Sequence, residues 1–332
     1  MVSIIVAVRN QAEYIEACVL SLINLDYPQK EIIVVDDAST DGTFELVRKL
    51  NVKLTGLKVQ GGPAKARNVG ALISEGEILA FVDGDCIVPS DWLKKIVKLY
   101  GQSVGAAGGP NYTPKDQVSF GRWVGYLPGV SGSLREDYCG GRVVHIRGCN
   151  SSYLAKAFWE VGGFDEAYTG GGGEEEDLTF RILNTGYRVV YSENAYLWHW
   201  RRKTLLDFLK QHYNYGRWGV FLRLRNGHIY SYAWRLLRSL SIYSIVIGLL
   251  LDNPLLISLP LPVLVSIIIK TLKESRKGVK LFGLSSRWIS LLFFLDLSRN
   301  CAYYTGFLVG HISVIPLLRQ KRKIIRDEAR IH

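Results

Sequence analysis

Residues 31–43 read EIIVVDDASTDGT, and residues 78–85 read ILAFVDGD. In both segments a short run of β-branched and other apolar residues ends abruptly in aspartate. A run of this length between polar residues is typical of a strand buried on both faces of a sheet. Residues 3–8 have the same character. Predicted helices at residues 13–22, 43–50 and 64–74 separate the three runs, and another at residues 92–100 follows the last. This alternation predicts an α/β fold with a mostly parallel sheet.

The later part of this pattern is weaker. Residues 142–147 and 188–191 are predicted as further strands, and residues 178–184 as a helix that ends before Gly186. Residues 101–138 are rich in glycine, proline and aromatic side chains and support no assignment. Ligands of open α/β sheets bind outside the carboxyl ends of the strands. Chemistry is therefore expected directly after each strand.

Asp36 and Asp37 directly follow the second strand. Carboxylates there can accept hydrogen bonds from the base and ribose hydroxyls of a nucleotide. The plainer interpretation is a helix N-cap by Ser39, Thr40 or Asp41. Both interpretations can hold together.

Asp83, Gly84 and Asp85 follow the strand at residues 78–82. Two carboxylates spaced in this way can share one divalent cation, and oxygen ligands favour Mg²⁺ or Mn²⁺. Such an ion would neutralise charge on a departing nucleoside diphosphate. The segment therefore predicts a metal and diphosphate site.

Four glycines, Gly170–Gly173, precede Glu174, Glu175, Glu176 and Asp177, with Arg181 one helical turn later. Successive carboxylates repel one another, so at least one is expected to have a raised pKa and to serve as a general base. The alternative is an acidic helix N-terminus stabilised by the helix dipole.

The chain changes character near residue 235. Apolar runs at residues 240–251 and 255–269 are separated by Asp252, Asn253 and Pro254, and a second pair lies at 289–295 and 301–318. Each run is shorter than the about 20 apolar residues of a straight membrane span. Single crossings, hairpins and re-entrant segments all remain open, as does a buried helical core. We expect a domain at residues 1–235 and membrane-associated helices with a basic tail at residues 236–332.

The net charge of +11 is concentrated beside these apolar runs. Basic residues of the linker 270–287 and of the tail 319–326 fit the cytoplasmic headgroup surface. No basic helix or aromatic-studded strand points to nucleic acid. Five cysteines without a CxxC pair suggest neither a disulfide framework nor a zinc site.

The ordered segments VSIIVAVRN, EIIVVDDASTDGT, AKARNVGA and ILAFVDGD, followed by GGFDE and GGGGEEEDLTFRI, resemble the GT-A fold of inverting family 2 glycosyltransferases over roughly residues 1–220. The resemblance implies nucleotide or diphosphate contacts for a set that also includes Asn68: Ala7, Arg9, Asn10, Asp36, Asp37, Lys65, Arg67, Asp83 and Gly84. It implies metal ligands at Asp83, Asp85 and, as in some relatives, His199. A lone histidine among aromatic residues is as often structural.

Alignment with the family's acidic segment places Glu175 at the catalytic base. Aspartate is usual there, so this sequence differs by one methylene, and Asp177 remains a competitor. The resemblance thus implies a Mn²⁺- or Mg²⁺-dependent transfer from a UDP- or GDP-sugar.

The membrane region suggests a polyprenyl-linked acceptor, with the enzyme at the cell membrane and its catalytic domain facing the cytoplasm. A bare polyprenyl phosphate is already ionised and needs no base, so the acidic cluster favours a lipid-linked saccharide. A polyprenyl-phosphate sugar synthase and a non-catalytic membrane scaffold are the alternatives. The sugar, the linkage and the oligomeric state stay open.

Overall fold

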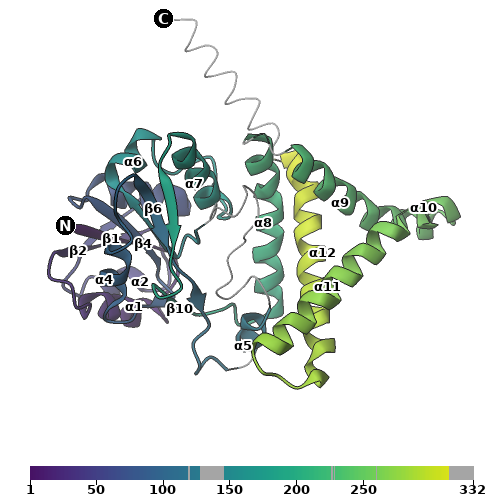
Figure 1. Cartoon of the computed structure of the whole chain (residues 1–332), viewed down its shortest axis with the longest axis horizontal. Coiled ribbons are helices and arrows are strands. Elements are labelled where there is room, and N and C mark those ends of the chain that lie inside the picture. The colour runs from purple at the N-terminus through teal and green to yellow at the C-terminus, as the bar shows by residue number, and fades with distance from the viewer. Residues whose placement is uncertain (119, 128–145, 226, 228, 259, 314–332) are drawn as a thin grey trace, which may run out of the picture. The chain divides into compact units, whose positions relative to one another are not determined.

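The computed structural model describes the chain except residues 119, 128–145, 226, 228, 259 and 314–332. The chain divides into two compact units (Figure 1). Unit 1 comprises residues 1–125 and 129–201, and unit 2 comprises residues 126–128 and 202–332. Each unit is described by itself.

A seven-stranded sheet forms the centre of unit 1, in the order β3-β2-β1-β4-β8-β6-β9. The strands are β1 (Val2–Val8), β2 (Lys30–Asp36), β3 (Lys53–Gly56), β4 (Ile78–Asp83), β6 (Val104–Gly108), β8 (Asn150–Leu154) and β9 (Arg188–Tyr191). The four strands from β3 to β4 are parallel, and β8 is antiparallel to both of its neighbours. The α/β prediction with a mostly parallel sheet is confirmed.

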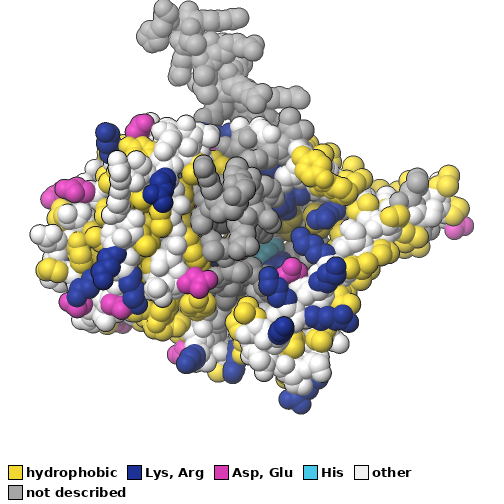
Figure 2. Space-filling view, viewed as in Figure 1, with side chains coloured by type: hydrophobic (Ala, Val, Ile, Leu, Met, Phe, Trp, Pro, Cys, Tyr) yellow, Lys and Arg dark blue, Asp and Glu magenta, His cyan; other side chains and the backbone are white. Residues whose placement is uncertain are grey.

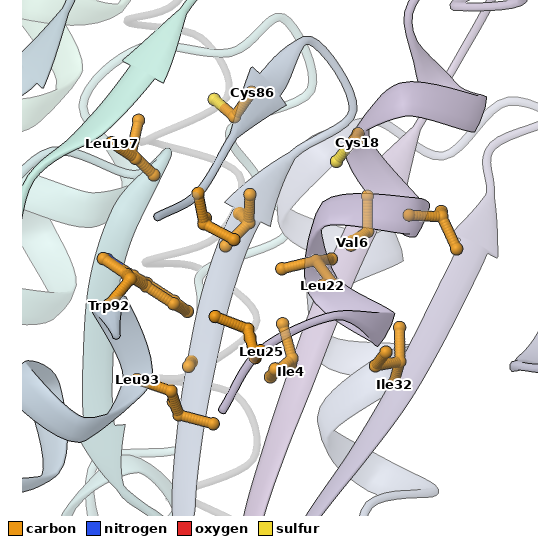
Figure 3. Close-up of a cluster of buried hydrophobic side chains, with 14 of the residues drawn as sticks. Ile4, Val6, Cys18, Leu22, Leu25, Ile32, Cys86, Trp92, Leu93 and Leu197 are labelled. Atoms are coloured by element: carbon orange, nitrogen blue, oxygen red, sulfur yellow. The ribbon is translucent and has the colours of Figure 1, made fainter. Parts of the chain in front are cut away.

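Helices cover both faces of this sheet because successive strand residues point to opposite sides. Ile4 and Val6 of β1 pack in the core shown in Figure 3, together with residues from α1 (Ile15–Ile23) and α4 (Trp92–Val97). Ile5, between them in sequence, packs in a second core with α3 (Pro63–Leu72), α6 (Ala155–Glu160) and α7 (Glu174–Asn184). The apolar runs of the sequence are buried on both faces, as predicted.

A small sheet lies beside the large one. It has the order β5-β10-β7, from β5 (Cys86–Ile87), β10 (Leu197–His199) and β7 (Asn111–Tyr112). Unit 1 also contains α2 (Thr43–Val47) and α5 (Phe120–Gly125). Of the strand predicted at 142–147, residues 142–145 lie outside the described residues. The helix predicted at 178–184 begins earlier, at Glu174.

Unit 2 is helical. Its elements are α8 (Leu205–Arg225), α9 (Ile229–Leu250), α10 (Pro254–Ser258), α11 (Leu261–Leu281), a 3₁₀ turn (Ser286–Trp288) and α12 (Ile289–Ser313). The apolar runs predicted at 289–295 and 301–318 belong, as far as Ser313, to the single helix α12. The polar residues between them do not interrupt it, because Asp296 and Arg299 pair one turn apart.

The division of the chain differs from the boundary expected near residue 235, because α8 packs along α12 in unit 2. Two glycines permit this approach. A Cβ atom on Gly216 would lie 1.9 Å from the Tyr303 carbonyl oxygen, and one on Gly306 would lie 1.9 Å from that of Tyr213. The amino-acid composition becomes strongly apolar only after residue 235, but the packed helices of unit 2 already begin with α8.

Candidate functional site

Asp36 and Asp37 lie at the carboxyl end of β2, and both are buried. The Asp37 carboxylate accepts hydrogen bonds from the backbone N–H groups of Gly61 (2.6 Å) and Gly62 (2.9 Å). Asp36 Oδ1 accepts one from Ser39 N, at 2.8 Å. Its Oδ2 atom is buried and has no hydrogen-bond partner among the described residues. A buried carboxylate oxygen of this kind can accept a hydrogen bond from a hydroxyl or N–H group of a ligand.

The loop after β1 is fixed against the loop after β2. Asn10 has a positive φ of 51°, its Oδ1 atom accepts from Thr40 N, and its backbone N–H donates to Ser39 Oγ. Ala7 is paired in register with both Val35 and Asp83, so it lies between the two acidic strand ends. Arg9 is exposed. The predicted nucleotide residues of β1 and β2 therefore share one edge of the sheet.

Arg67 of α3 connects two acidic segments that are far apart in sequence. Its Nη2 atom donates to Asp83 Oδ1 and its Nη1 atom to Glu174 Oε1, each at 2.9 Å. Burial opposes the charge of Arg67, but Asp83 and Glu174 outweigh it and raise the pKa of the guanidinium. Lys65, also on α3, is exposed. The guanidinium group of Arg67 thus connects the DGD segment to the start of α7.

The acidic residues of α7 have different environments. Asp177 is fully buried, and its Oδ2 atom accepts from Arg181 Nε at 2.8 Å. Glu175 Oε2 is a buried atom without a hydrogen-bond partner in the described part of the chain. Burial, with the adjacent Glu174 charge, raises the pKa of Glu175 well above its ordinary value. A carboxyl group of this kind is suited to proton transfer near neutral pH.

The glycine loop before α7 has a constrained backbone. Gly171, Gly172 and Gly173 all have positive φ angles, of 72°, 113° and 104°. Side chains other than glycine rarely adopt this region. The Gly172 N–H also donates to Glu174 Oε2 at 2.6 Å. The backbone conformation of this loop therefore fixes how the chain enters α7, and with it the positions of Glu174 and Glu175.

Asp83, Asp85 and His199 form a candidate cation site. One ligand atom from each of the three residues lies within 4.8 Å of the others. Two carboxylate oxygens and an imidazole nitrogen suit Mn²⁺ or Mg²⁺. The residues fit such an ion, although Asp83 also bonds Arg67. Gly84, between the two aspartates, is buried, and a Cβ atom there would lie 2.9 Å from Val8 Cγ2.

His199 is held from both sides. Its Nε2 atom lies 3.2 Å from Asp85 Oδ1, and its Nδ1 atom lies 2.9 Å from Arg201 Nη1. Burial opposes a charge on the ring, but the Asp85 carboxylate outweighs it and raises the pKa of His199 to about 9. A guanidinium N–H can only donate, so the Arg201 bond to Nδ1 forms in the neutral ring with its proton on Nε2, and protonation of the ring, which the raised pKa favours, breaks that bond. A cation bound through Nε2 must displace that proton.

Several residues around this site were not predicted from the sequence. Cys86 and Cys149 lie close to His199, and Asn111 Nδ2 donates to Cys149 Sγ at 2.9 Å. The Cys86 thiol donates to Cys149, and with His199 it lowers the pKa of Cys149 well below its ordinary value. Glu174 was recognised only as one of four acids. The available signal was position alone, because Cys86 directly follows the DGD segment and Cys149 directly precedes β8.

Comparison with known proteins identifies the domain. Residues 3–162 match the model of glycosyl transferase family 2, and residues 135–201 match the model described as the N-terminal domain of galactosyltransferase. The chain is 39% identical over 116 residues to glycosyltransferase AglE of Haloferax volcanii, a match that covers 32% of this chain and 38% of that protein. It is 29% identical over 258 residues to the beta-monoglucosyldiacylglycerol synthase of a Nostoc species, covering 68% and 52%. The chain therefore spans less than two thirds of the length of these curated relatives.

A solved structure extends the similarity of fold. The mannosyltransferase PcManGT from Pyrobaculum calidifontis, in complex with GDP-Man and Mn²⁺, superimposes with a TM-score of 0.57 at 19% sequence identity. The match covers 92% of this chain and 86% of that one. With the mostly parallel sheet, it confirms the predicted GT-A fold.

Proposed function

Residues 3–162 form a glycosyltransferase family 2 domain, and we propose that this chain transfers a sugar from a UDP- or GDP-sugar to an acceptor hydroxyl with inversion at the anomeric carbon. The observation that carries this proposal is the Arg67 bridge between Asp83 and Glu174. It brings the DGD segment close to the helix end that contains Glu175. The residues proposed to stabilise the leaving group, Asp83 and Asp85, therefore lie close to Glu175, the residue proposed to remove the acceptor proton.

The nucleotide has acceptors at the ends of β1 and β2. The Oδ2 atom of Asp36, which has no hydrogen-bond partner among the described residues, is assigned to a ribose or base donor, and Asp37 holds the backbone of Gly61 and Gly62 in place. Ala7, Arg9 and Asn10 line the same edge. Because Arg67 is occupied by two carboxylates, we assign the diphosphate to the exposed Lys65 and give Arg67 a positioning role.

Asp83, Asp85 and His199 would hold Mn²⁺ or Mg²⁺. When bound, the ion supplies positive charge that stabilises the departing nucleoside diphosphate. PcManGT, by its description, holds GDP-Man and Mn²⁺ together. The bond from Arg201 and the bond to Asp85 orient the His199 ring before any ligand arrives.

Glu175 is our choice for the base that takes the acceptor proton. Its Oε2 atom lacks a partner among the described residues, whereas the Asp177 carboxylate is bonded to Arg181 and fully buried. The raised pKa of Glu175 matches a group that must accept a proton near neutral pH. Asp177 then stabilises the helix.

Unit 2 supports a membrane location. Two of its segments, Tyr230–Leu250 and Pro254–Leu281, are long and apolar enough to cross a membrane by length and composition alone. Figure 2 shows hydrophobic side chains gathered over the arm formed by α9, α10 and α11, with Lys and Arg side chains nearer its base. Large apolar residues on this arm are exposed, Leu249, Leu250 and Leu255 among them.

The part of each helix that lies beyond the basic residues is shorter than the hydrocarbon core of a bilayer. From Arg238 to Leu251 the helix rises about 20 Å, at about 1.5 Å per residue, whereas the hydrocarbon core is about 30 Å thick. The returning leg reaches Lys270 after a similar apolar run. We therefore propose that the arm enters and leaves the membrane from one side, the cytoplasmic one, where these basic residues meet anionic headgroups.

An acceptor on a lipid follows from this location. By its name, the Nostoc relative makes a glycosylated diacylglycerol, so a relative of this chain uses a lipid. We propose a polyprenyl-linked saccharide, because its hydroxyl needs the base that Glu175 offers. A bare polyprenyl phosphate would need none.

The test is nucleoside diphosphate release from a panel of UDP- and GDP-sugars, with Mn²⁺ or Mg²⁺, by detergent-solubilised protein. We expect release from one donor, more of it when a lipid extract is added, and none in Asp85→Ala. No release from any donor by protein shown to be folded would overturn the proposal and favour a membrane scaffold. Full-rate glycosylation of polyprenyl phosphate by Glu175→Gln would overturn the choice of acceptor.

A further inference from the structure

A second set of ligand atoms lies against the carboxylate site. We propose that Cys86, Cys149 and His199 form a separate site for a zinc-class divalent cation, one that prefers sulfur and imidazole ligands. Ligand atoms of these three residues lie within 4.8 Å of one another. The inference rests on these side chains and not on the proposed glycosyl transfer.

The three side chains converge because of strand pairing. Cys86 in β5 and His199 in β10 are direct partners in an antiparallel pair, and direct partners project their side chains to the same face. Cys149 comes from the residue just before β8. Both cysteines are buried, with 1% and 5% of their surface exposed.

Neighbouring side chains hold this arrangement in place. Asn150, next to Cys149, accepts from Trp92 Nε1 and donates to the carbonyl oxygens of Pro110 and Ala195. Asn111 Nδ2 donates to Cys149 Sγ at 2.9 Å. A hydrogen bond of this kind orients a thiolate ligand from outside the coordination sphere. The site is therefore ordered by contacts that do not themselves bind a metal.

The ligand chemistry differs from that of the neighbouring set. Two sulfurs and an imidazole select zinc-class ions, whereas Asp83 and Asp85 offer the oxygens that Mg²⁺ and Mn²⁺ prefer. On binding, each thiol that becomes a ligand releases its proton to solvent. The Arg201 guanidinium must leave His199 Nδ1, but it retains bonds to Thr113 Oγ1 and to the Asn111 carbonyl oxygen.

His199 belongs to both sets of ligands, so binding of an ion at one set is expected to affect binding at the other. An ion held by the cysteines binds Nδ1, and the neutral ring then carries its proton on Nε2, the nitrogen that faces Asp85 and that an ion at the aspartates would otherwise bind. Zinc-class ions are therefore expected to oppose Mn²⁺ or Mg²⁺ at the carboxylates. Such antagonism would make the protein sensitive to the balance between hard and soft cations.

The test uses the full-length chain in detergent, reduced with a phosphine and titrated with Cd²⁺. We expect one equivalent to produce a thiolate charge-transfer band in the near ultraviolet, and cadmium NMR to report two sulfur ligands. Cys86→Ser and Cys149→Ser should each weaken Cd²⁺ binding by more than about 100-fold, beyond the loss caused by removing an outer partner. Cys301→Ser, at an exposed cysteine of unit 2, is the matched control.

A missing band in the wild-type protein would overturn the proposal, as would a band that survives in both variants. Cadmium NMR on the wild type decides the matter even if the serine variants misfold, because a signal typical of oxygen ligands alone would also overturn it. If the transferase is active, the zinc concentration that halves its rate should rise by more than about 100-fold in Cys149→Ser, in step with the lost affinity for the soft ion. Failure of the transferase would leave the spectroscopic result unaffected.

Discussion

Replacing Glu175 by glutamine and Asp177 by asparagine separates catalysis from helix stability within one turn of α7. Both changes remove a charge and keep the shape of the side chain. Glu175 Oε2 is buried without a described partner, whereas Asp177 is bonded to Arg181. We expect Glu175→Gln to abolish turnover and Asp177→Asn to weaken the fold.

The magnitudes follow from these environments. Loss of a general base lowers the rate by about 10²–10⁴-fold, which corresponds to about 3–5 kcal/mol of barrier. Asp177→Asn loses a charged acceptor in a buried bond, so it should lower the free energy of unfolding by about 1–3 kcal/mol. Its rate should stay within about tenfold of the wild type below its melting temperature, since the base is untouched.

Stability should move in the opposite sense in Glu175→Gln. The pKa of Glu175 is raised in the folded state, so the folded protein holds this proton more tightly than the unfolded chain does. The stability that depends on the proton is present below the ordinary glutamate pKa and is lost as pH rises through the raised value. Glutamine does not titrate, so the variant should gain stability relative to the wild type over that window.

Two assays check this reasoning: nucleoside diphosphate release with acceptor present, and thermal unfolding followed by intrinsic fluorescence at about pH 4, below the ordinary glutamate pKa, and at stepped values above it. The wild-type rate should fall on the acid side at a pH above the ordinary glutamate pKa. Glu175→Gln with wild-type turnover, or Asp177→Asn with wild-type stability and no turnover, would refute the assignment of the base.

Three further outcomes are expected. Asp37→Asn should lower the free energy of unfolding by about 1–3 kcal/mol and weaken nucleoside diphosphate binding in calorimetry, because its amide would present a donor to a backbone N–H group. Gly216→Ala should cost about 1–3 kcal/mol by overpacking in thermal unfolding, since the new Cβ atom would lie 1.9 Å from the Tyr303 carbonyl oxygen. Leu250→Asp should reduce flotation with anionic vesicles on the order of 100-fold, because a buried aspartate costs about 2.5–3.5 kcal/mol in a membrane.

Each of these has a matched control. Asp26→Asn changes an exposed carboxylate, Gly101→Ala places a Cβ atom with nothing within 4 Å, and Val59→Asp changes an exposed apolar residue of unit 1. All three controls should behave as the wild type. If Val59→Asp reduced flotation as much as Leu250→Asp does, the arm would not be the membrane contact.

Part of the fold could be predicted because β1, β2 and β4 are nearly continuous apolar runs, each followed or ended by a polar residue. The first, second and fourth strands lie where the sequence predicted them, as do the carboxylates at the ends of the second and fourth. The acidic start of α7 was also recognised. These features are local, and local periodicity reports them directly.

Other features depend on contacts between distant residues. Arg67 meets Glu174 across 107 positions, and no local pattern encodes that meeting. Cys86 and Cys149 converge through strand pairing, so their spacing in sequence gave no signal. The packing of α8 on α12 rests on single glycines, which look unremarkable in a helical pattern.

The shared arginine has a consequence for the evolution of this domain. Loss of either Asp83 or Glu174 would leave Arg67 with one counterion, and loss of Arg67 would leave the buried Glu174 carboxylate without its counterion, which costs far more than losing an exposed pair. Substitutions at the three positions are therefore expected to be epistatic, each tolerated only in the company of another. A lineage that drops Glu174 should also have replaced Arg67, and natural variation at these sites should occur in concert.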